Sequence, residues 1–162
     1  PVEEDEFIDK DINIRDYLHE IISSFKEISK KEFVFNFDQD SNPKKISKSI
    51  EIVYGLRNFI GNANKFAKNT IFINLKSDSE ITEITVEDDG DGYPRDIISK
   101  IGEPYLKSNY SKDKSKEGLG LGLFIGKTLL EKNFASVNCR NSKTRNGAEV
   151  VIRWKNKELF NI

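Results

Sequence analysis

The strongest constraint on the fold is a pair of alternating segments, residues 70–77 and 81–88, separated only by a short turn at Asp78 and Ser79. Apolar and polar residues alternate through most of both segments, a pattern typical of strands that bury one face. The short connection predicts that the two strands pair as an antiparallel hairpin. Because the apolar face of a sheet must pack against another layer, the hairpin needs helices on one side.

Other periodic segments supply those helices and further strands. Apolar side chains recur at helical spacing from Ile14 to Ile28 and, over a longer stretch, from Ser47 to Lys68. The remaining expected elements are helices at 94–101 and 120–132 and strands at 33–37, 135–140 and 148–154. Helices group beside strands instead of alternating strictly with them. The pattern therefore predicts an α+β fold, a two-layer α/β sandwich in which about three helices cover one face of a mixed, mostly antiparallel sheet.

The length of 162 residues suits one domain, which we expect to span residues 14–162. Residues 1–13 are acidic and poorly patterned, and we expect them to form a linker. Residues 102–118 are polar and rich in lysine, which predicts a mobile loop. The chain begins at Pro1 and contains no Met, so we expect it to be part of a longer protein. No apolar run approaches the length of a membrane span.

Charge and cysteine content exclude several classes of function. A formal net charge of −1 does not provide the basic surface of a nucleic-acid-binding domain. We expect neither nucleic acid nor a membrane as a partner of this domain. The one cysteine, Cys139, excludes an internal disulfide framework. Cys139 is then either a redox sensor or a small apolar residue of a strand.

The first motif that carries chemistry is Asp88-Asp-Gly-Asp-Gly92, at the end of the second hairpin strand. Its glycines allow the backbone to turn and to approach a ligand closely. A carboxylate at this place can accept a hydrogen bond from an exocyclic amine such as that of adenine. A solvated turn rich in Asp and Gly would have the same composition, so the motif alone leaves both interpretations open.

The second motif is Gly118-Leu-Gly-Leu-Gly-Leu123, directly before an amphipathic helix. Glycines leave the backbone N–H groups at a helix N-terminus accessible, where a phosphate binds favourably. The spacing fits neither a Walker A loop nor a dinucleotide-binding fingerprint. The motif indicates an anion site of another kind, and a plain flexible loop is the alternative.

The third motif lies on the long helix, where Asn58 and Asn62 are four residues apart and Lys65 follows. This spacing places both amides on one face of the helix. Amide oxygens can join water and phosphate oxygens around Mg²⁺, and Lys65 can meet a phosphate as a point charge. A solvated helix face in an Asn-rich chain is the alternative.

In this order and spacing, the three motifs resemble those of the GHKL superfamily, whose members share the Bergerat ATP-binding fold. Residues 57–66 resemble its N box, residues 86–93 its G1 box and residues 118–123 its G2 box. Gly102-Glu-Pro-Tyr105 stands where histidine kinases carry the F box, and its sequence is similar to that of the redox-responsive RegB/PrrB group. The resemblance covers roughly residues 14–154.

This resemblance implies the ATP-binding catalytic domain of a two-component sensor histidine kinase. Such a domain binds Mg-ATP and donates the γ-phosphate to a histidine on a separate dimerisation domain, for relay to an aspartate of a response regulator. The superfamily's ATPases have a water-activating glutamate where this chain has Asn58. An amide is no general base, so ATP would be protected from hydrolysis. Residues 1–13 would lead from the dimerisation helices.

The resemblance also assigns the site residues. Asp88 would bind the adenine amine, and Asn62, assisted by Asn58, would ligate Mg²⁺. Asn58 and Lys107 would serve catalysis, and residues 102–118 would form a lid that orders when nucleotide binds. The residues expected to contact ATP are Asn58, Asn62, Lys65, Phe66, Asp88, Gly90, Gly92, Tyr93, Ile101, Lys107, Gly118, Leu119, Gly120, Leu121, Gly122 and Leu123.

Some positions depart from the family pattern. Gly102 and Tyr105 replace the usual F-box phenylalanines, and Lys107 stands where many members have Arg. A Gly-Thr pair common near the last strand is Gly147-Ala148 here, which removes one hydroxyl from the adenine side. None of these changes removes a group on which nucleotide binding depends.

His19 is the only histidine of the chain. It lacks the sequence that follows the phospho-acceptor in this family, and it falls on a helix that the resemblance places inside the ATP-binding domain. We therefore expect an exposed helix residue. The chain alone would be a monomer that binds ATP without autophosphorylation, and its parent a homodimer in the bacterial inner membrane with this domain in the cytoplasm.

Three other functions stay open. A stand-alone ATPase of the same superfamily would hydrolyse ATP steadily, but Asn58 argues against it. A serine kinase of the anti-sigma type shares the fold and would lack the dimerisation helix. A nucleotide-free interaction module would keep only the fold, and calorimetry with an ATP analogue and Mg²⁺ distinguishes it from the others.

Overall fold

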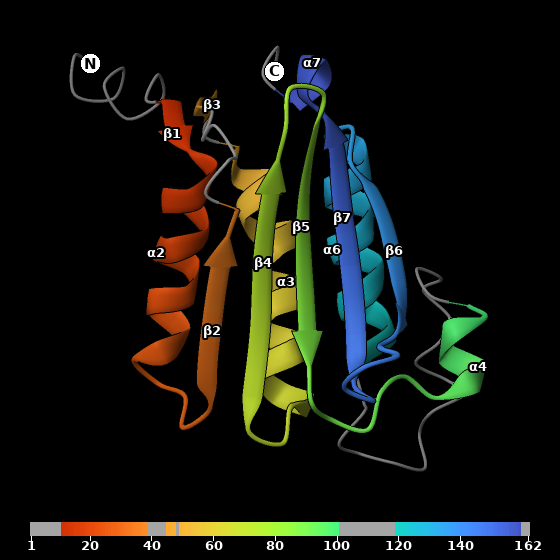
Figure 1. Ribbon diagram of the computed structural model, residues 1–162. Helices are drawn as coiled ribbons and strands as arrows, with labels where there is room; N and C mark the ends of the chain where they lie inside the picture. Colours follow the sequence, from red (N-terminus) through yellow and green to blue (C-terminus); the bar gives the residue numbers. More distant parts are fainter. Residues whose placement is uncertain (1–10, 39–44, 48, 101–118, 160–162) are drawn as a thin grey trace.

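The computed structural model describes residues 11–38, 45–47, 49–100 and 119–159. Its main sheet has five strands in the order β2-β4-β5-β7-β6 (Figure 1). Strand β2 runs parallel to β4, and the other neighbours are antiparallel, which confirms the expected mixed, mostly antiparallel sheet. The strands are β2 (Glu32–Phe37), β4 (Thr70–Ser77), β5 (Ile81–Asp88), β6 (Ser136–Asn141) and β7 (Ala148–Lys155).

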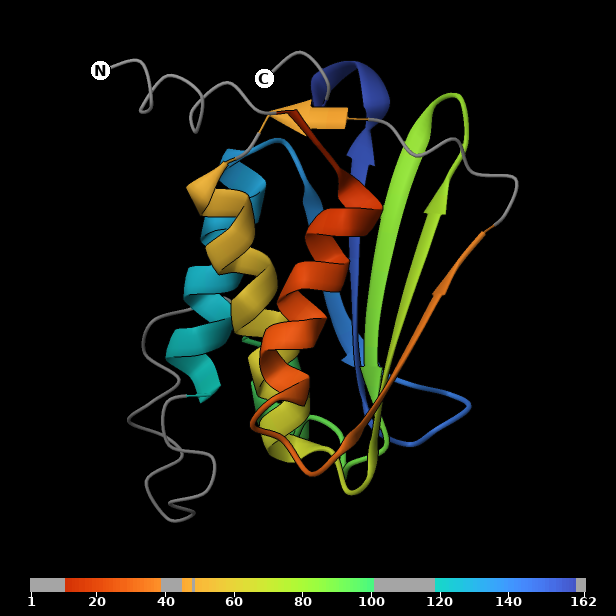
Figure 2. The same ribbon diagram turned by 90° about the vertical axis from the view of Figure 1, so that its left-hand side faces the viewer.

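The long helices α2 (Ile14–Lys26), α3 (Ile50–Phe66) and α6 (Leu119–Lys132) all lie on one face of this sheet (Figure 2). The predicted two-layer sandwich is therefore confirmed, and the other face of the sheet carries no helix among the described residues. Two short helices, α4 (Arg95–Ile98) and α7 (Asn156–Leu159), lie near opposite ends of the sheet (Figure 1). None of the described helices combines the length and apolar composition that crossing a bilayer requires.

The core lies between the two layers and explains the sequence pattern. The inward positions of β4 and β5 alternate with polar ones, and Ile71, Ile73 and Ile84 are fully buried there. Helix α3 begins at a cap, because the Ser49 side chain accepts a hydrogen bond from the backbone N–H of Ile52. A fully buried aliphatic side chain stabilises the fold by roughly 1.5–3 kcal/mol.

Small residues bring α3 and α6 close together. A Cβ atom at Gly55 would lie 2.6 Å from Cγ of Leu130, and one at Gly126 would lie 2.9 Å from the Phe59 ring. Any larger side chain at these places would force the helices apart. The long helix that carries Asn58 and Asn62 is thereby fixed against the helix that follows the Gly-Leu motif.

Three short elements were not predicted. Residues 11–13, expected to belong to a linker, form strand β1 (Asp11–Asn13), which pairs antiparallel with β3 (Lys45–Ser47). Strands of this length are too short to show a period in the sequence. Helix α7 is held by Asn156, which accepts a hydrogen bond from the Thr82 hydroxyl and donates one to the carbonyl of Asp78, both at 2.7 Å. The predicted lid, residues 102–118, lies outside the described residues.

Candidate functional site

A pocket lies between helix α3 and the ends of β5 and β7, and most of its lining is apolar. Asn62 and Asp88 contribute an amide and a carboxylate to this lining. Its residues are Phe59, Asn62, Ala63, Phe66, Val86, Asp88, Gly92, Tyr93, Ala148 and Val150. An apolar cleft with a few convergent polar groups is the usual form of a small-molecule site. The structure thus brings the motif on the long helix next to the Asp-Gly motif.

Asp88 is held in one orientation by the backbone. Its side chain is buried, and Oδ1 accepts hydrogen bonds from the N–H of Gly90 at 2.8 Å and of Ala148 at 3.3 Å. No described residue donates a hydrogen bond to the other oxygen, Oδ2. Burial raises the pKa of Asp88, and the two N–H groups offset part of that rise. The carboxylate is thus fixed by one oxygen and can accept a bond from a ligand with the other.

The glycines of the Asp-Gly motif are required by close packing. A Cβ atom at Gly90 would lie 2.2 Å from the carbonyl oxygen of Phe66, at the end of α3. Gly92 has φ +80°, a left-handed conformation that other residues adopt only with strain, and a Cβ there would lie 2.7 Å from Oδ1 of Asn141. Because Asp88 is buried and these glycines press against neighbouring elements, the motif is not a solvated turn.

Asp89, the next residue, has a different role. Its carboxylate accepts hydrogen bonds from the N–H groups of Lys68, Asn69 and Thr70 at 2.8–3.2 Å, in the turn between α3 and β4. Desolvation raises its pKa, but the bonds from these N–H groups outweigh it and hold the pKa of Asp89 below the usual value. Asp89 therefore stabilises the turn, and Asp88 is the carboxylate available to a ligand.

Asn62 presents a buried amide without a partner. Its Nδ2 has no hydrogen bond within the described part of the chain. A Cβ atom at Gly122, in the first turn of α6, would lie 3.4 Å from this nitrogen. Buried polar atoms are nearly always paired, so an orphaned amide indicates a missing ligand or water. A half-turn of the side-chain amide exchanges its oxygen and nitrogen, so either atom can face the missing partner.

The donor set around Asn62 is suited to a weakly protein-bound Mg²⁺. Among the described residues, no cluster of three or more His, Cys, Asp or Glu side chains could hold a metal. Mg²⁺ commonly uses few protein ligands and completes its shell with water and ligand phosphates. The Asn62 amide oxygen could serve as one ligand in that mode of binding.

Several expected site residues do not line the pocket, among them Asn58, Lys65 and Leu123. The amide of Asn58 donates to the carbonyl of Tyr54 at 2.7 Å, within α3. The Lys65 ammonium lies 5.3 Å from the centre of the Phe66 ring, so it stands beside a pocket residue in solvent. Leu123 is fully buried in the core.

The Gly-Leu motif is described only in part. Helix α6 begins at Leu119, so Gly120 and Leu121 belong to its first turn, where free N–H groups can bind an anion. Ile101, Lys107 and Gly118 lie outside the described residues.

Sequence patterns did not single out Asn141 as a site residue. Its Oδ1 accepts from the Tyr93 N–H at 2.6 Å, and its Nδ2 donates to the Tyr93 carbonyl at 3.1 Å. This pair fixes the loop after β5 to strand β6. No local signal marks it, because the two residues are 48 positions apart.

Cys139 is a free, partly buried thiol of β6 that packs against the core. Burial raises the pKa of its thiol to about 12. The reactive thiolate is therefore scarce at neutral pH, and the thiol behaves as a small packing group. This favours the second of the two interpretations of Cys139, a strand residue without redox chemistry.

Comparison with known proteins agrees with this geometry. Residues 47–158 match the family described as histidine kinase-, DNA gyrase B- and HSP90-like ATPase. The sensor histidine kinase RegB of Cereibacter sphaeroides is 40% identical over 97 residues, which are 57% of this chain and 21% of that protein. The sensor protein RstB of Escherichia coli K12 is 31% identical over 99 residues, which are 61% of this chain and 23% of that protein. The chain thus spans about a fifth of these relatives, and the expected similarity to RegB is confirmed.

Solved structures share the fold. The nucleotide-free catalytic domain of the histidine kinase ThkA superposes with a TM-score of 0.73 at 21% identity, covering 90% of this chain and 96% of that one. The mycobacterial sensor histidine kinase MprB superposes with a TM-score of 0.69 at 17% identity, covering 91% and 97%. Structural similarity at such low sequence identity establishes only that the fold is shared.

Proposed function

Because the chain belongs to the family of histidine kinase-, DNA gyrase B- and HSP90-like ATPases, we propose that it binds Mg-ATP in the pocket between α3 and β5 and serves as the catalytic domain of a sensor histidine kinase. The single observation that carries this proposal is the buried Asp88 carboxylate, fixed through Oδ1 and open at Oδ2. A ligand that fits must offer an N–H donor on a flat apolar body, as adenine does.

The pocket binds the base by its walls and by one directed bond. Ala63 and Phe66 of α3 face Val86 and Val150 of the sheet across the space that the purine would fill. Oδ2 of Asp88 accepts from the exocyclic amine, a charge-assisted bond roughly twice as strong as a neutral one. A base with a carbonyl at that position would meet the carboxylate lone pair instead, so guanine is disfavoured.

The phosphates extend toward the first turn of α6, past Asn62 and Gly122, where an added Cβ atom would lie 3.4 Å from the Asn62 amide. The Asn62 amide ligates Mg²⁺, which neutralises phosphate charge when bound. Lys65, and Lys107 and Gly118 from the segment before α6, supply further positive charge and N–H donors. Positioning and charge neutralisation are the main contributions a protein makes to phosphoryl transfer.

Asn58 argues for a kinase over an ATPase. Its amide is bonded to the Tyr54 carbonyl, one turn from Asn62. An amide has no proton-accepting capacity at neutral pH, so no base at this position activates water. The γ-phosphate is then transferred to a histidine on the dimerisation domain of the parent protein and onward to a response regulator. The exposed His19, on α2, is not the acceptor.

The proposed function also implies a location and an oligomeric state. The parent would be a homodimer in the bacterial inner membrane with this domain on the cytoplasmic side, and the isolated chain would be a monomer.

Calorimetric titration of the chain with a non-hydrolysable ATP analogue and Mg²⁺ tests the proposal. We expect one site, with the guanine analogue bound more weakly by at least about tenfold, the value of one charge-assisted hydrogen bond. Steady ATP hydrolysis by the chain alone would point to a stand-alone ATPase. Failure of both analogues to bind would leave an interaction module that keeps only the fold.

A further inference from the structure

The turn between β6 and β7, residues 142–147, packs directly against the backbone of Asp88. A Cβ atom at Gly147 would lie 1.9 Å from the carbonyl oxygen of Asp88, so only glycine fits. The N–H of Ala148, the next residue, donates to Oδ1 of Asp88 at 3.3 Å. The turn is closed by a 2.7 Å bond from the Ser142 N–H to the Gly147 carbonyl. The position of this turn therefore controls one of the bonds that orient Asp88.

The same turn is tied to β5 on the opposite face of the sheet through Glu87. Successive side chains of a strand point to opposite faces, so Glu87 points away from the pocket that Asp88 faces. The Glu87 carboxylate is buried and accepts hydrogen bonds from Nε of Arg145 at 3.2 Å and from the Ser142 hydroxyl. Both donors belong to the turn, so one buried carboxylate holds it at two points.

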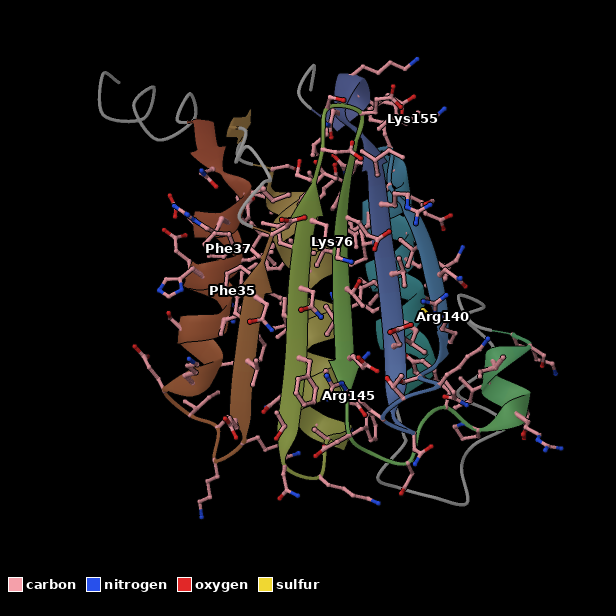
Figure 3. All side chains as sticks on the ribbon, in the orientation of Figure 1. Phe35, Phe37, Lys76, Arg140, Arg145 and Lys155 are labelled. Atoms are coloured by element: carbon pink, nitrogen blue, oxygen red, sulfur yellow. The ribbon has the colours of Figure 1, made fainter. Side chains whose placement is uncertain are left out.

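Arg145 is itself fixed by a third element. Its guanidinium lies 3.5 Å from the centre of the Phe72 ring of β4. Figure 3 shows Arg145 over the lower part of β4 and β5, on the sheet face that carries no helix. A guanidinium stacked on a ring and paired with a buried carboxylate is better ordered than an exposed ion pair. The turn is therefore anchored to two strands, β5 through Glu87 and β4 through Phe72.

Other ion pairs on this face differ from that arrangement. Arg153 donates to Glu83 at 2.6 Å and joins β7 to β5, but it touches no residue of the turn. The Glu83 side chain is 24% exposed and that of Glu87 is 7% exposed. Exposed pairs contribute little to stability. Arg153–Glu83 is thus a matched comparison for Arg145–Glu87.

We propose that Glu87, Arg145 and Phe72 are positioning residues for nucleotide binding, which hold the β6–β7 turn so that Ala148 keeps the Asp88 carboxylate aimed into the pocket. The identification of the ligand as a nucleotide rests on the proposed function. The contacts that link the β6–β7 turn to Asp88 do not depend on it. Neighbouring carboxylates of β5 then have complementary roles on the two faces of the sheet. Asp88 meets the base, and Glu87 holds the turn that orients Asp88.

Amide hydrogen exchange in the nucleotide-free protein tests the geometry. In Arg145→Ala, exchange of the Ala148 amide should become faster by at least about threefold, as expected when one modest interaction is lost. In the control Arg153→Ala the Ala148 rate should not change. Equal Ala148 exchange in the two variants, measured where thermal melts show both to be folded, would overturn the inference.

Titration with the ATP analogue and with ADP tests the consequence. Arg145→Ala should lower the affinity for both ligands by the same factor, about threefold to tenfold. The two ligands share the adenine, whose binding is affected, and differ only in their phosphates, whose binding is not. Arg153→Ala should bind like wild type, and Arg145→Lys, which keeps the charge but not the planar stack, should be intermediate. Wild-type affinity in Arg145→Ala would refute the inference. If wild type bound neither ligand, the proposed function would fail, and Ala148 exchange would still decide the positioning role.

Discussion

The side-chain amide of Asn62 lies against Gly122, where an added Cβ atom would be 3.4 Å from Nδ2 and 3.5 Å from Oδ1. This spacing places the pocket-lining face of α3 beside the first turn of α6. The amide nitrogen is buried and has no hydrogen bond among the described residues. Since an unpaired buried polar group lowers stability, folding alone does not favour asparagine here.

Replacing Asn62 by Ala should therefore separate binding from stability. We expect the enhancement of ATP-analogue affinity by Mg²⁺ to fall, because the amide ligand is lost. The free energy of unfolding should stay within about 1 kcal/mol of wild type or rise, because an orphaned polar group is removed. Calorimetry with and without Mg²⁺ and urea denaturation measure the two effects.

Asn58→Ala is the control for that experiment, since the Asn58 amide is bonded within α3 and does not line the pocket. Its effect on the Mg²⁺ enhancement should be smaller. Full enhancement in Asn62→Ala would mean that the metal is held elsewhere.

Asp88→Asn should weaken binding of the adenine nucleotide by about tenfold to a hundredfold, from the loss of roughly 1.5–3 kcal/mol in one charge-assisted hydrogen bond. The amide oxygen can still accept from Gly90 and Ala148, so the loop should keep its shape. Asp91→Asn is the matched control, because Asp91 is exposed and pairs with Lys68 at 3.3 Å on the surface. Unchanged affinity in Asp88→Asn would refute the adenine assignment.

Asp89→Asn should affect stability instead of affinity, and the effect should depend on pH. The folded state holds the pKa of Asp89 below its usual value of 3.8. A carboxyl of this kind stabilises the fold above that pH, and the contribution is lost as the pH falls through the lower, folded-state pKa. Urea midpoints of wild type and variant should differ at about pH 7 and converge toward about pH 2. If the difference between the two urea midpoints stayed constant over this pH range, the ionised Asp89 carboxylate would not be the cause of the difference in stability.

Phe134→Gly should stabilise the protein. Phe134 has φ 72° and is 56% exposed at the end of α6. The N–H of Ala135 bonds to the Leu130 carbonyl at 3.0 Å, a helix ending that usually has glycine at this place. A left-handed conformation costs a side chain roughly 1–2 kcal/mol, and glycine loses about 0.5–1 kcal/mol through its more flexible unfolded state. The net gain should be about 1 kcal/mol by urea denaturation.

The control is Asn146→Gly. Asn146 also has a positive φ, 63°, but asparagine adopts this conformation easily. Its replacement should change stability less than that of Phe134. A loss of stability in Phe134→Gly would show that the exposed ring makes a contribution that its surroundings do not reveal.

Local patterns account for most of the fold. The strands at 70–77 and 81–88 match β4 and β5 as predicted, because alternation over a full strand is a strong signal. The three-residue strands β1 and β3 and the helix α7 escaped prediction. Elements of this size are held by tertiary contacts, such as that of Asn156 with Thr82, which no local pattern records.

The same distinction holds within the site. The Asp-Gly motif identified Asp88 and Gly92, and spacing on the helix identified Asn62, and all three line one pocket. Asn58 and Lys65 share that helix but do not line the pocket, because a helix face is wider than a pocket wall.

Residues close together in the chain were enough to predict the α+β sandwich and the family, and they nominated the candidate groups of the pocket. What orients those groups became visible only in the folded chain. Asp88 is held by Ala148, which is 60 residues away, and Tyr93 by Asn141, which is 48 away. Antiparallel pairing of β5, β7 and β6 brings these residues together, and such contacts between distant residues leave no trace in local periodicity.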